Sequence, residues 1–334
     1  MRVVCLGAGY FSQFHLDGWR RINGVDLVGI SNRDRAKAEA TGVPVFGTLA
    51  QMLDQARPDI LDIIVSPAGH AEAIRQAVRH DLKAIICQKP FCTSMDEAQA
   101  MIDLARDAGI PLIVHENFRF QPWYRAIAAS IGAGDIGTPL QATFRLRPGD
   151  GQGPEAYLAR QPYFQEMPQF LVHETGVHWI DTFRFLFGNP SAVYADLRRV
   201  NEVIAGEDAG YILFDHANGV RVLFDGNRCL DHAAENTRCT MGEGLFEGTK
   251  GTLALRGDGS VRLRVFGSQD EQEIHPADDT GIFGGDCTHR LQAHVVRALN
   301  GGSSFENEAQ DYLTVIRIEH AVYNSSQSQA KIKM

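Results

Sequence analysis

Residues 1–15 read MRVVCLGAGYFSQFH, and this stretch decides the fold of the first part of the chain. Residues 3–6 form a short apolar strand pattern, and a helical pattern begins at Phe11. Gly7 permits a tight turn between the two, and Gly9, which has no Cβ, lets backbone N–H groups approach an anion at the positive end of the helix. A strand, a glycine turn and a helix in this order predict a binding site for a pyrophosphate.

The turn also matches the first two glycines of the G-x-G-x-x-G pattern of dinucleotide-binding folds. Ser12 replaces the third glycine, and a small serine fits there because that position serves close packing of the helix on the strand. The pattern alone is weak, and an ordinary glycine-rich turn is the alternative. Its place between a strand and a helix favours a dinucleotide pocket formed by Gly7, Gly9, Tyr10 and Phe11.

Length and composition are those of a globular chain with two domains. The chain has 334 residues, of which 44% are hydrophobic and 22% charged. Its net charge of -9 argues against a nucleic-acid partner, and no apolar run approaches the ~20 residues that cross a bilayer. The six cysteines include no C-x-x-C pair. We therefore expect free thiols, a cytoplasmic protein, and neither a nucleic-acid nor a membrane partner.

Strands and helices alternate along the first third of the chain. Strands are predicted at residues 2–6, 26–31, 45–46, 60–65, 84–87 and 112–115, and helices at residues 11–21, 34–41, 49–55, 71–79 and 95–108. Short apolar strands that alternate with helices form a parallel sheet covered on both faces. Residues 1–120 are therefore predicted to be a doubly wound nucleotide-binding domain.

The end of the second predicted strand bears on the choice of cofactor. An acid about 20 residues after the glycines binds the ribose 2′-OH in NAD enzymes, and this chain has Asn32 and Arg33 there, followed by Asp34. No carboxylate at positions 32 and 33 repels a 2′-phosphate, and Arg33 is suited to pair with one or to stack on adenine. These residues favour NADP(H). NAD(H) stays open if Asp34 turns inward, and Arg33 is otherwise a solvated charge at a helix start.

Two further strand ends carry candidate cofactor residues, because ligands of open α/β sheets bind at the carboxyl ends of the strands. The first group is Ser66, Pro67 and His70, and the second is Gln88 and Lys89. Lys89 follows a buried strand, where a cation is costly unless a polar site receives it. A surface charge is the alternative interpretation of Lys89.

The pattern changes after residue 120. Alternating runs at residues 140–146, 192–200, 209–214, 220–224, 252–256 and 261–265, several joined by Asn-Gly or Asp-Gly, predict a large, mainly antiparallel open sheet. Helices are predicted at residues 123–131, 171–187, 289–299 and 308–324, and loops at residues 148–168 and 277–286. Residues 121–334 are thus predicted to be a second α/β domain.

The helix predicted at residues 171–187 carries Glu174, His178 and Asp181, which share one face at the spacing i, i+4, i+7. The rest of this helix is so apolar that its polar groups need partners. A catalytic group and a satisfied core histidine are both compatible with His178. A zinc site is disfavoured because His173 and His178 do not share a helix face.

Together, these motifs resemble the glucose-fructose oxidoreductase / inositol dehydrogenase / MocA family over nearly the whole chain. The resemblance rests on Gly7-x-Gly9 with His15, Lys89-Pro90, Asn117-x-Arg119-Phe120 and Glu174-x-Gly176-x-His178-x-x-Asp181. It implies a Rossmann domain and an α/β domain, NAD(P) as cofactor, and oxidation or reduction of a sugar or polyol. It also implies a homodimer or homotetramer formed through the second sheet. Further runs are similar to the branch that contains D-apiose dehydrogenases.

The resemblance assigns the reaction to Lys89, Glu174 and His178, which flank the substrate. This chain differs from the family at two points, since Gln88 replaces a glutamate and Glu174 replaces an aspartate. The substrate contacts expected from residue type are Asn117, Arg119, Gln121, Trp123 and Tyr163, although an interdomain salt bridge is equally compatible with Arg119.

The expected reaction is hydride transfer from a sugar carbon to nicotinamide. His178 takes the hydroxyl proton, Lys89 stabilises the oxygen, and Glu174 orients the imidazole. The family also permits lysine as the proton-transfer group. A cofactor-binding sensor without catalysis is the competing hypothesis.

Overall fold

The computed structural model describes all residues 1–334, which form two compact units. Unit 1 comprises Met1–Asn117 and Thr288–Ile316, and unit 2 comprises Phe118–Cys287 and Arg317–Met334. The boundary predicted at residue 120 lies close to the change of unit between Asn117 and Phe118. The sequence contains no sign that a late segment belongs with unit 1, because a chain's return to an earlier unit depends on packing rather than on local pattern.

Unit 1 is built on a six-stranded parallel sheet with the order β3-β2-β1-β4-β5-β6, the strand order of dinucleotide-binding folds. The strands are β1 (Arg2–Leu6), β2 (Asp26–Ser31), β3 (Val45–Phe46), β4 (Ile60–Ile63), β5 (Ala84–Gln88) and β6 (Leu112–His115). The strands β4 and β5 are buried along their whole length, as expected for a sheet covered on both faces. The predicted doubly wound sheet is confirmed.

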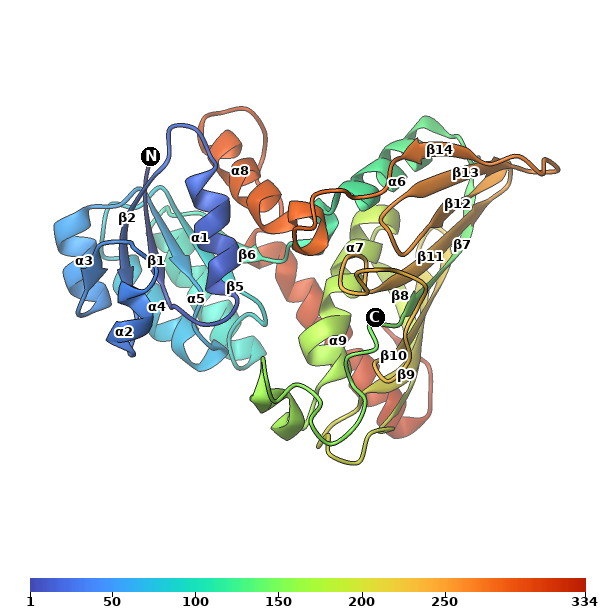
Figure 1. Ribbon diagram of the computed structural model, residues 1–334, viewed down its shortest axis with the longest axis horizontal. Helices are drawn as coiled ribbons and strands as arrows, with labels where there is room; N and C mark the ends of the chain where they lie inside the picture. Colours follow the sequence, from blue (N-terminus) through green and yellow to red (C-terminus); the bar gives the residue numbers. More distant parts are fainter. The chain divides into compact units, whose positions relative to one another are not determined.

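The helices of unit 1 lie on both sides of this sheet (Figure 1). They are α1 (Ser12–Arg20), α2 (Arg35–Glu39), α3 (Leu49–Ala56), α4 (His70–Ala77), α5 (Met95–Asp107) and, from Thr288 onward, α8 (Cys287–Leu299). The helix α8 packs directly on α1, where Gln292 donates a hydrogen bond to the carbonyl of His15 and the ring of His289 contacts the carbonyl of Gly18. A segment almost 300 residues from the N-terminus thus completes the first unit.

The glycine turn between β1 and α1 is held between the ends of two neighbouring strands. The Gly7 N–H donates to the carbonyl of Ser31 at 2.8 Å, and the φ of Gly7 is +117°. A Cβ on Gly7 would lie 2.9 Å from the backbone of Ile64, whereas a Cβ on Gly9 would meet no atom within 4 Å. Gly7 is therefore required by the fold, and Gly9 leaves the backbone open.

Unit 2 contains a nine-stranded sheet with the order β14-β13-β12-β11-β7-β10-β9-β8-β15, in which only β7 and β10 pair in parallel. Its strands are β7 (Pro139–Leu146), β8 (Pro190–Arg198), β9 (Ala209–His216), β10 (Arg221–Asn227), β11 (Gly242–Gly248), β12 (Gly251–Leu255), β13 (Val261–Val265), β14 (Gln272–His275) and β15 (Ile332–Lys333). Asn218-Gly219 joins β9 to β10, and Asp258-Gly259 joins β12 to β13, as predicted.

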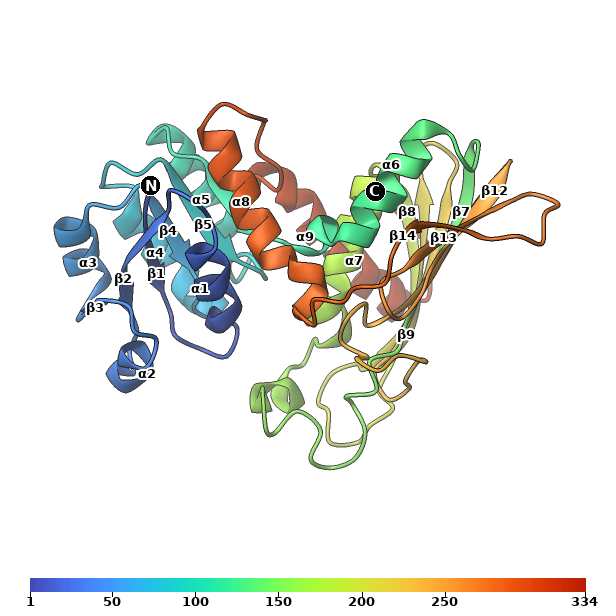
Figure 2. The same cartoon turned by 45° about the horizontal axis from the view of Figure 1, so that its top comes forward.

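Within unit 2, the helices α6 (Pro122–Ala133), α7 (Val177–Phe187) and the second half of α9 (Ala309–Ser328) cover one face of the sheet (Figure 2). Trp179 of α7 packs on Phe144 and Phe224 of the sheet, with ring centroids 4.6 and 5.6 Å away. No helix of unit 2 covers the opposite face. The predicted open, mainly antiparallel sheet is confirmed.

Two kinds of element were not foreseen in unit 2. The strands β11, β14 and β15 lack the apolar alternation that marks the others, and β11 reads GEGLFEG. In addition, the predicted helix at residues 171–187 is divided into a π-helical turn (Leu171–Gly176) and the α-helix α7. Nothing in apolar periodicity separates these two helix types. None of the helices in the structure is both long enough and apolar enough to span a membrane.

Alanine substitutions at the two glycines of the turn are predicted to differ in their effect on stability. Gly7→Ala adds a Cβ against the Ile64 backbone at a positive φ, so we expect the free energy of unfolding to fall by about 2 kcal/mol or more. Gly9→Ala fills open space and is expected to change it by less than about 0.5 kcal/mol. Urea unfolding of the two variants measures the difference. Equal destabilisation by both would show that the turn is not held as described.

Candidate active site

The glycine turn and the end of β2 are joined by Asn32. Its Oδ1 accepts a hydrogen bond from the Ala8 N–H at 3.0 Å, and its Nδ2 donates to the carbonyl of Asp34 at 2.8 Å. The Asp34 carboxylate caps α2 by accepting from the N–H groups of Ala36 and Lys37. Asn32 therefore supports the turn, and the carboxylate of Asp34 is engaged at the start of α2, while Arg33 is exposed beside it.

His70, one of the predicted cofactor contacts, is held in place by hydrogen bonds to the backbone. It is completely buried, and its Nε2 donates to the carbonyl of Val65 at 2.9 Å, while its Nδ1 accepts from the Cys92 N–H at 3.5 Å. Burial lowers the pKa of His70 to about 4, which keeps the ring neutral. His70 thus ties the loop after β4 to the loop after β5. Ser66 and Pro67, by contrast, lie at the surface of the first loop.

Lys89 follows the last residue of β5 and is partly exposed. The side chain of Gln88 turns back on the backbone, so that its Oε1 accepts the Lys89 N–H at 2.7 Å. The Lys89–Pro90 peptide is cis. Gln88 therefore fixes the backbone from which the Lys89 side chain extends. This backbone lies at the carboxyl end of the sheet, the edge where this fold binds ligands.

The residues of unit 1 fit a bound dinucleotide. This fold receives pyrophosphate at the glycine turn, and here Gly9 is open and the N-terminus of α1 follows directly. It receives ribose and nicotinamide at strand ends, and here polar residues lie at the ends of β2 and β5. Gly7 and Asn32 would hold the turn against the pyrophosphate. When bound, the nicotinamide ring supplies the hydride acceptor.

In unit 2, His178 lies in the first turn of α7 and is 8% exposed. Its ring stacks on that of Phe118, with centroids 3.9 Å apart and planes only 6° from parallel. Phe118 in turn meets Trp179 edge-on at 5.2 Å. Because one face of the imidazole is covered by Phe118, the ring is held in one plane and presents its nitrogens edgewise.

Glu174 precedes His178 on the π-helical turn, and it is partly exposed. The wider turn is seen in the Val177 N–H, which donates to Val172, five residues earlier. Such turns occur often at functional sites. Burial, with the negative charge of Glu174 next in importance, raises the pKa of Tyr163 to about 12. Glu174 and Tyr163, predicted separately from the sequence, are therefore neighbours.

A buried arginine connects the Glu174 turn to the loop that carries Tyr163. Arg228, at 2% exposure, donates from Nη1 to Thr175 Oγ1 at 2.6 Å, from Nε to the Tyr157 hydroxyl at 2.7 Å, and from Nη2 to Asp150 at 2.7 Å. Its guanidinium lies 5.0–5.8 Å from the rings of Tyr157, Phe164 and Phe170. No local sequence pattern points to Arg228, since its partners are 53 to 78 residues away.

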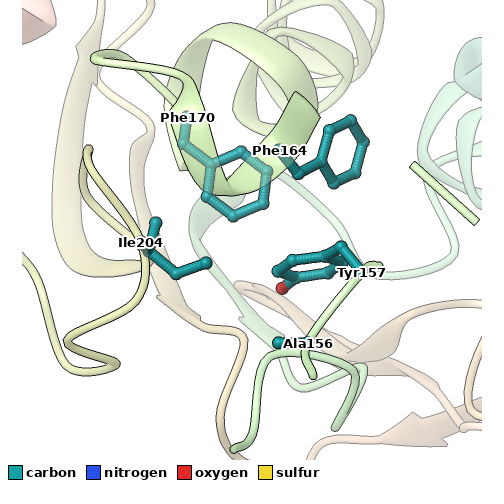
Figure 3. Packing of buried hydrophobic residues seen from close by; sticks show 5 residues of the cluster. All are labelled: Ala156, Tyr157, Phe164, Phe170 and Ile204. Carbon is teal, nitrogen blue, oxygen red and sulfur yellow. The ribbon is translucent and has the colours of Figure 1, made fainter. Parts of the chain in front are cut away.

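The aromatic rings around this arginine form a small core of their own (Figure 3). Tyr157, Phe164 and Phe170 lie with centroids 5.0–5.3 Å apart, and Ala156 and Ile204 complete the cluster. Tyr163 packs edge-on against Phe164 at 4.9 Å. The segment predicted as a loop at residues 148–168 is thus well packed, and its cluster holds Tyr163 beside the π-helical turn.

Four of the predicted substrate contacts have hydrogen-bond partners within their own units. Arg119 forms a buried two-pronged ion pair with Asp181, also in unit 2, with Nε 2.8 Å from Oδ2. Trp123 is completely buried and donates to Gln121 Oε1 at 2.7 Å, while Asn117 is 1% exposed and donates to Thr288 in unit 1. Asp181 is thus one partner of Arg119, and Trp123, Gln121 and Asn117 are buried side chains with hydrogen-bond partners in their own units.

Comparisons with known proteins agree with this architecture. Residues 1–116 match the model of an oxidoreductase family with an NAD-binding Rossmann fold, and residues 124–254 match that of the GFO/IDH/MocA C-terminal domain. D-apiose dehydrogenase from Paraburkholderia graminis is 31% identical over 98% of this chain and 88% of its own length. D-xylose 1-dehydrogenase (NADP(+)) 2 from Haloferax volcanii is 24% identical over 92% of each chain.

Among solved structures, an oxidoreductase from Agrobacterium radiobacter in complex with NAD+, L-tartaric acid and magnesium is similar with a TM-score of 0.90 and 26% identity, covering 100% of this chain and 98% of the other. Sequence and structure comparisons thus extend over both units. The chain belongs to the GFO/IDH/MocA family of NAD-binding oxidoreductases.

Proposed function

We propose that this protein is an NAD(P)-dependent dehydrogenase that transfers a hydride between a nicotinamide cofactor and a hydroxyl-bearing carbon of a sugar or polyol. The observation that carries the proposal is the open glycine turn followed, at the same edge of the sheet, by a lysine on a held backbone position. The relatives named for D-apiose and D-xylose support a pentose-like substrate.

The proposed mechanism assigns each step to a side chain. As the hydride leaves the sugar carbon, the hydroxyl proton passes to His178, whose ring Phe118 holds in plane. The Lys89 ammonium stabilises the negative charge that develops on the same oxygen. Glu174, one turn before His178, stabilises the imidazolium that results, and Tyr163 beside it contributes a hydroxyl to substrate binding.

Two substitutions test this mechanism. Lys89→Met and His178→Asn remove a charge or a proton acceptor, and we expect each to lower the rate constant of hydride transfer by about 100-fold or more. Stopped-flow measurement of reduced nicotinamide with a panel of pentoses, hexoses and inositols reports that rate. Leu230→Ala, at an exposed position on the loop after β10, is the control and is expected to leave the rate unchanged.

The same panel distinguishes an enzyme from a sensor. Rates within a few-fold of the wild type in both variants would contradict the mechanism. Tight cofactor binding by the wild type without turnover of any sugar would instead identify a cofactor-binding sensor.

We further propose that the enzyme prefers NADP(H). The carboxylate of Asp34, the acid nearest the end of β2, is engaged as the cap of α2, and Arg33 beside it is exposed. An exposed guanidinium is suited to a two-pronged contact with the 2′-phosphate, while no carboxylate at positions 32 and 33 repels that group.

This preference predicts an asymmetric effect of Arg33→Ala. Loss of a charge-assisted contact is expected to lower kcat/KM for NADP+ by about 10-fold or more, with a change of less than about 3-fold for NAD+. Arg35→Ala removes an equal charge two residues away, from an arginine paired with Glu39, and is the matched control. Equal losses with both cofactors, or a wild-type preference for NAD+, would contradict the proposal.

The open face of the unit 2 sheet is proposed to bind a second copy of the chain. A continuous row crosses six strands on this face through directly paired positions: Tyr194, Leu213, Leu223, Thr143, Leu245 and Ala254. Charges of both signs border the row, with Asp225 and Arg145 on one side and Asp215 and Arg221 on the other. An apolar centre bordered by both signs of charge suits a self-complementary, two-fold interface.

The proposed interface predicts that a substitution within the row lowers the mass of the assembly in solution. Leu245→Glu places a carboxylate in this row, so we expect sedimentation velocity to show dissociation toward monomers. Val200→Glu, on the loop after β8, is the control and should keep the wild-type mass. A wild-type monomer at micromolar concentration would contradict the proposed interface.

A further inference from the structure

A chain of buried hydrogen bonds in unit 1 connects the middle of the sheet to the backbone of Lys89. It begins at Asp62 in β4, which is completely buried. Asp62 Oδ2 accepts from His15 Nδ1 at 2.8 Å and from the Trp19 indole at 2.7 Å, both on α1. A carboxylate is costly in this place unless such donors satisfy it. The helix that follows the glycine turn is thereby anchored to a charge inside the sheet.

The chain continues through Gln88, whose amide orientation is determined by its two neighbours. The backbone N–H of Lys89 is a donor only, so the Gln88 atom that accepts it at 2.7 Å is Oε1. Gln88 Nε2 therefore faces His15 Nε2, at 3.1 Å. Since an amide nitrogen only donates, His15 Nε2 accepts and carries no proton, while Nδ1–H donates to Asp62. This geometry requires a neutral imidazole.

The other titratable groups around His15 are consistent with one buried charge on Asp62. The ring of His115 lies 4.1 Å from that of His15, and burial, together with the charge of Asp62, raises the pKa values of the Cys5 and Cys87 thiols, so both stay protonated. Asp62 Oδ2 accepts two N–H donors, from His15 and from Trp19, as an ionised carboxylate does.

We infer that Gln88 and His15 are positioning residues for Lys89: the Asp62–His15–Gln88 chain holds the Lys89 peptide in place, and the amide at position 88 keeps His15 neutral. The inference rests on the proposed role of Lys89 and goes beyond it. A carboxylate at position 88 would also accept the Lys89 N–H, but its second oxygen would face His15 Nε2. That contact requires a proton on Nε2 and so converts His15 into an imidazolium between two carboxylates.

Nitrogen-15 NMR of the full chain, labelled at its histidines, tests the charge state. The His15 signals are identified by their loss in His15→Gln. At pH 7 the wild type is expected to show one protonated and one unprotonated ring nitrogen with the proton on Nδ1, and Gln88→Glu is expected to show both nitrogens protonated. An imidazolium or an Nε2–H ring in the wild type would overturn the inference.

Transient kinetics test the positioning role. Gln88→Met removes the acceptor for the Lys89 N–H, and we expect the rate constant of hydride transfer to fall by about 10-fold or more, with the cofactor dissociation constant within about 2-fold of the wild type. Gln88→Glu restores an acceptor and is expected to recover most of the rate. Gln88→Asn, which is too short to reach the peptide but keeps a polar amide, replaces the methionine variant if that variant does not fold.

The control is His216→Gln, which alters another buried histidine, in unit 2, whose Nδ1 is hydrogen-bonded to the backbone carbonyl of Gly188 and whose ring packs on Phe187. It is expected to leave the hydride-transfer rate unchanged. A wild-type rate in Gln88→Met or Gln88→Asn would overturn the positioning role. Failure of the proposed function is distinguishable, because a wild-type rate in Lys89→Met would remove the role of lysine while leaving the NMR result for His15 intact.

Discussion

The close approach of the Gly7 backbone to Ile64 is the constraint on which unit 1 depends. A Cβ at Gly7 would lie 2.9 Å from the Ile64 backbone, and the Gly7 N–H is bonded to Ser31 on the other side. Because the turn is held between the ends of β2 and β4, the chain can continue from it in only one direction. That direction places α1 over β4, where His15 and Trp19 reach Asp62. One turn thus sets the positions of both the open Gly9 backbone and the buried hydrogen-bond chain.

In unit 2, buried charged side chains hold the π-helical turn in place. Arg228 links Asp150, Tyr157 and Thr175, and Glu207 accepts from the N–H groups of Phe170 and Val172 at the start of the π-helical turn. Burying charges is expensive, and each of these is compensated by several hydrogen bonds rather than by one. Such networks specify one arrangement of the backbone. The turn that carries Glu174 is therefore held from both of its ends.

The two differences from the family that the resemblance implies, at positions 88 and 174, lie close in sequence to the residues proposed to react, Lys89 and His178. Gln88 accepts the peptide N–H of Lys89, and Glu174 lies on the turn before His178. At position 88 the exchange of a carboxylate for an amide removes a charge next to a buried histidine. At position 174 the additional methylene extends the reach of the carboxylate. The first change alters charge and the second alters side-chain length, and neither requires a different backbone fold.

Local pattern was sufficient for most of the architecture. Apolar strands, helical periodicity and glycine-containing turns predicted the parallel sheet of unit 1 and most strands of unit 2. They also predicted that Gly7, Gly9 and Lys89 lie at the carboxyl edge of the sheet. These features are predictable because they depend on near neighbours in the chain. The glycine-rich β11 and the short β15 were missed, since their pairing is decided by adjacent strands rather than by their own residues.

Tertiary structure alone decided the partners of the polar side chains. His70 was predicted as a ligand contact from its place at a strand end, and Arg119 and Trp123 from their residue types. The structure adds their partners Val65, Asp181 and Gln121, which the sequence does not reveal. Nor does the sequence indicate Arg228, Asp62 or the return of residues 288–316 to unit 1. Periodicity shows which face of an element is buried. A polar group's partner depends on which distant segment packs there, and that is determined only when the whole chain has folded.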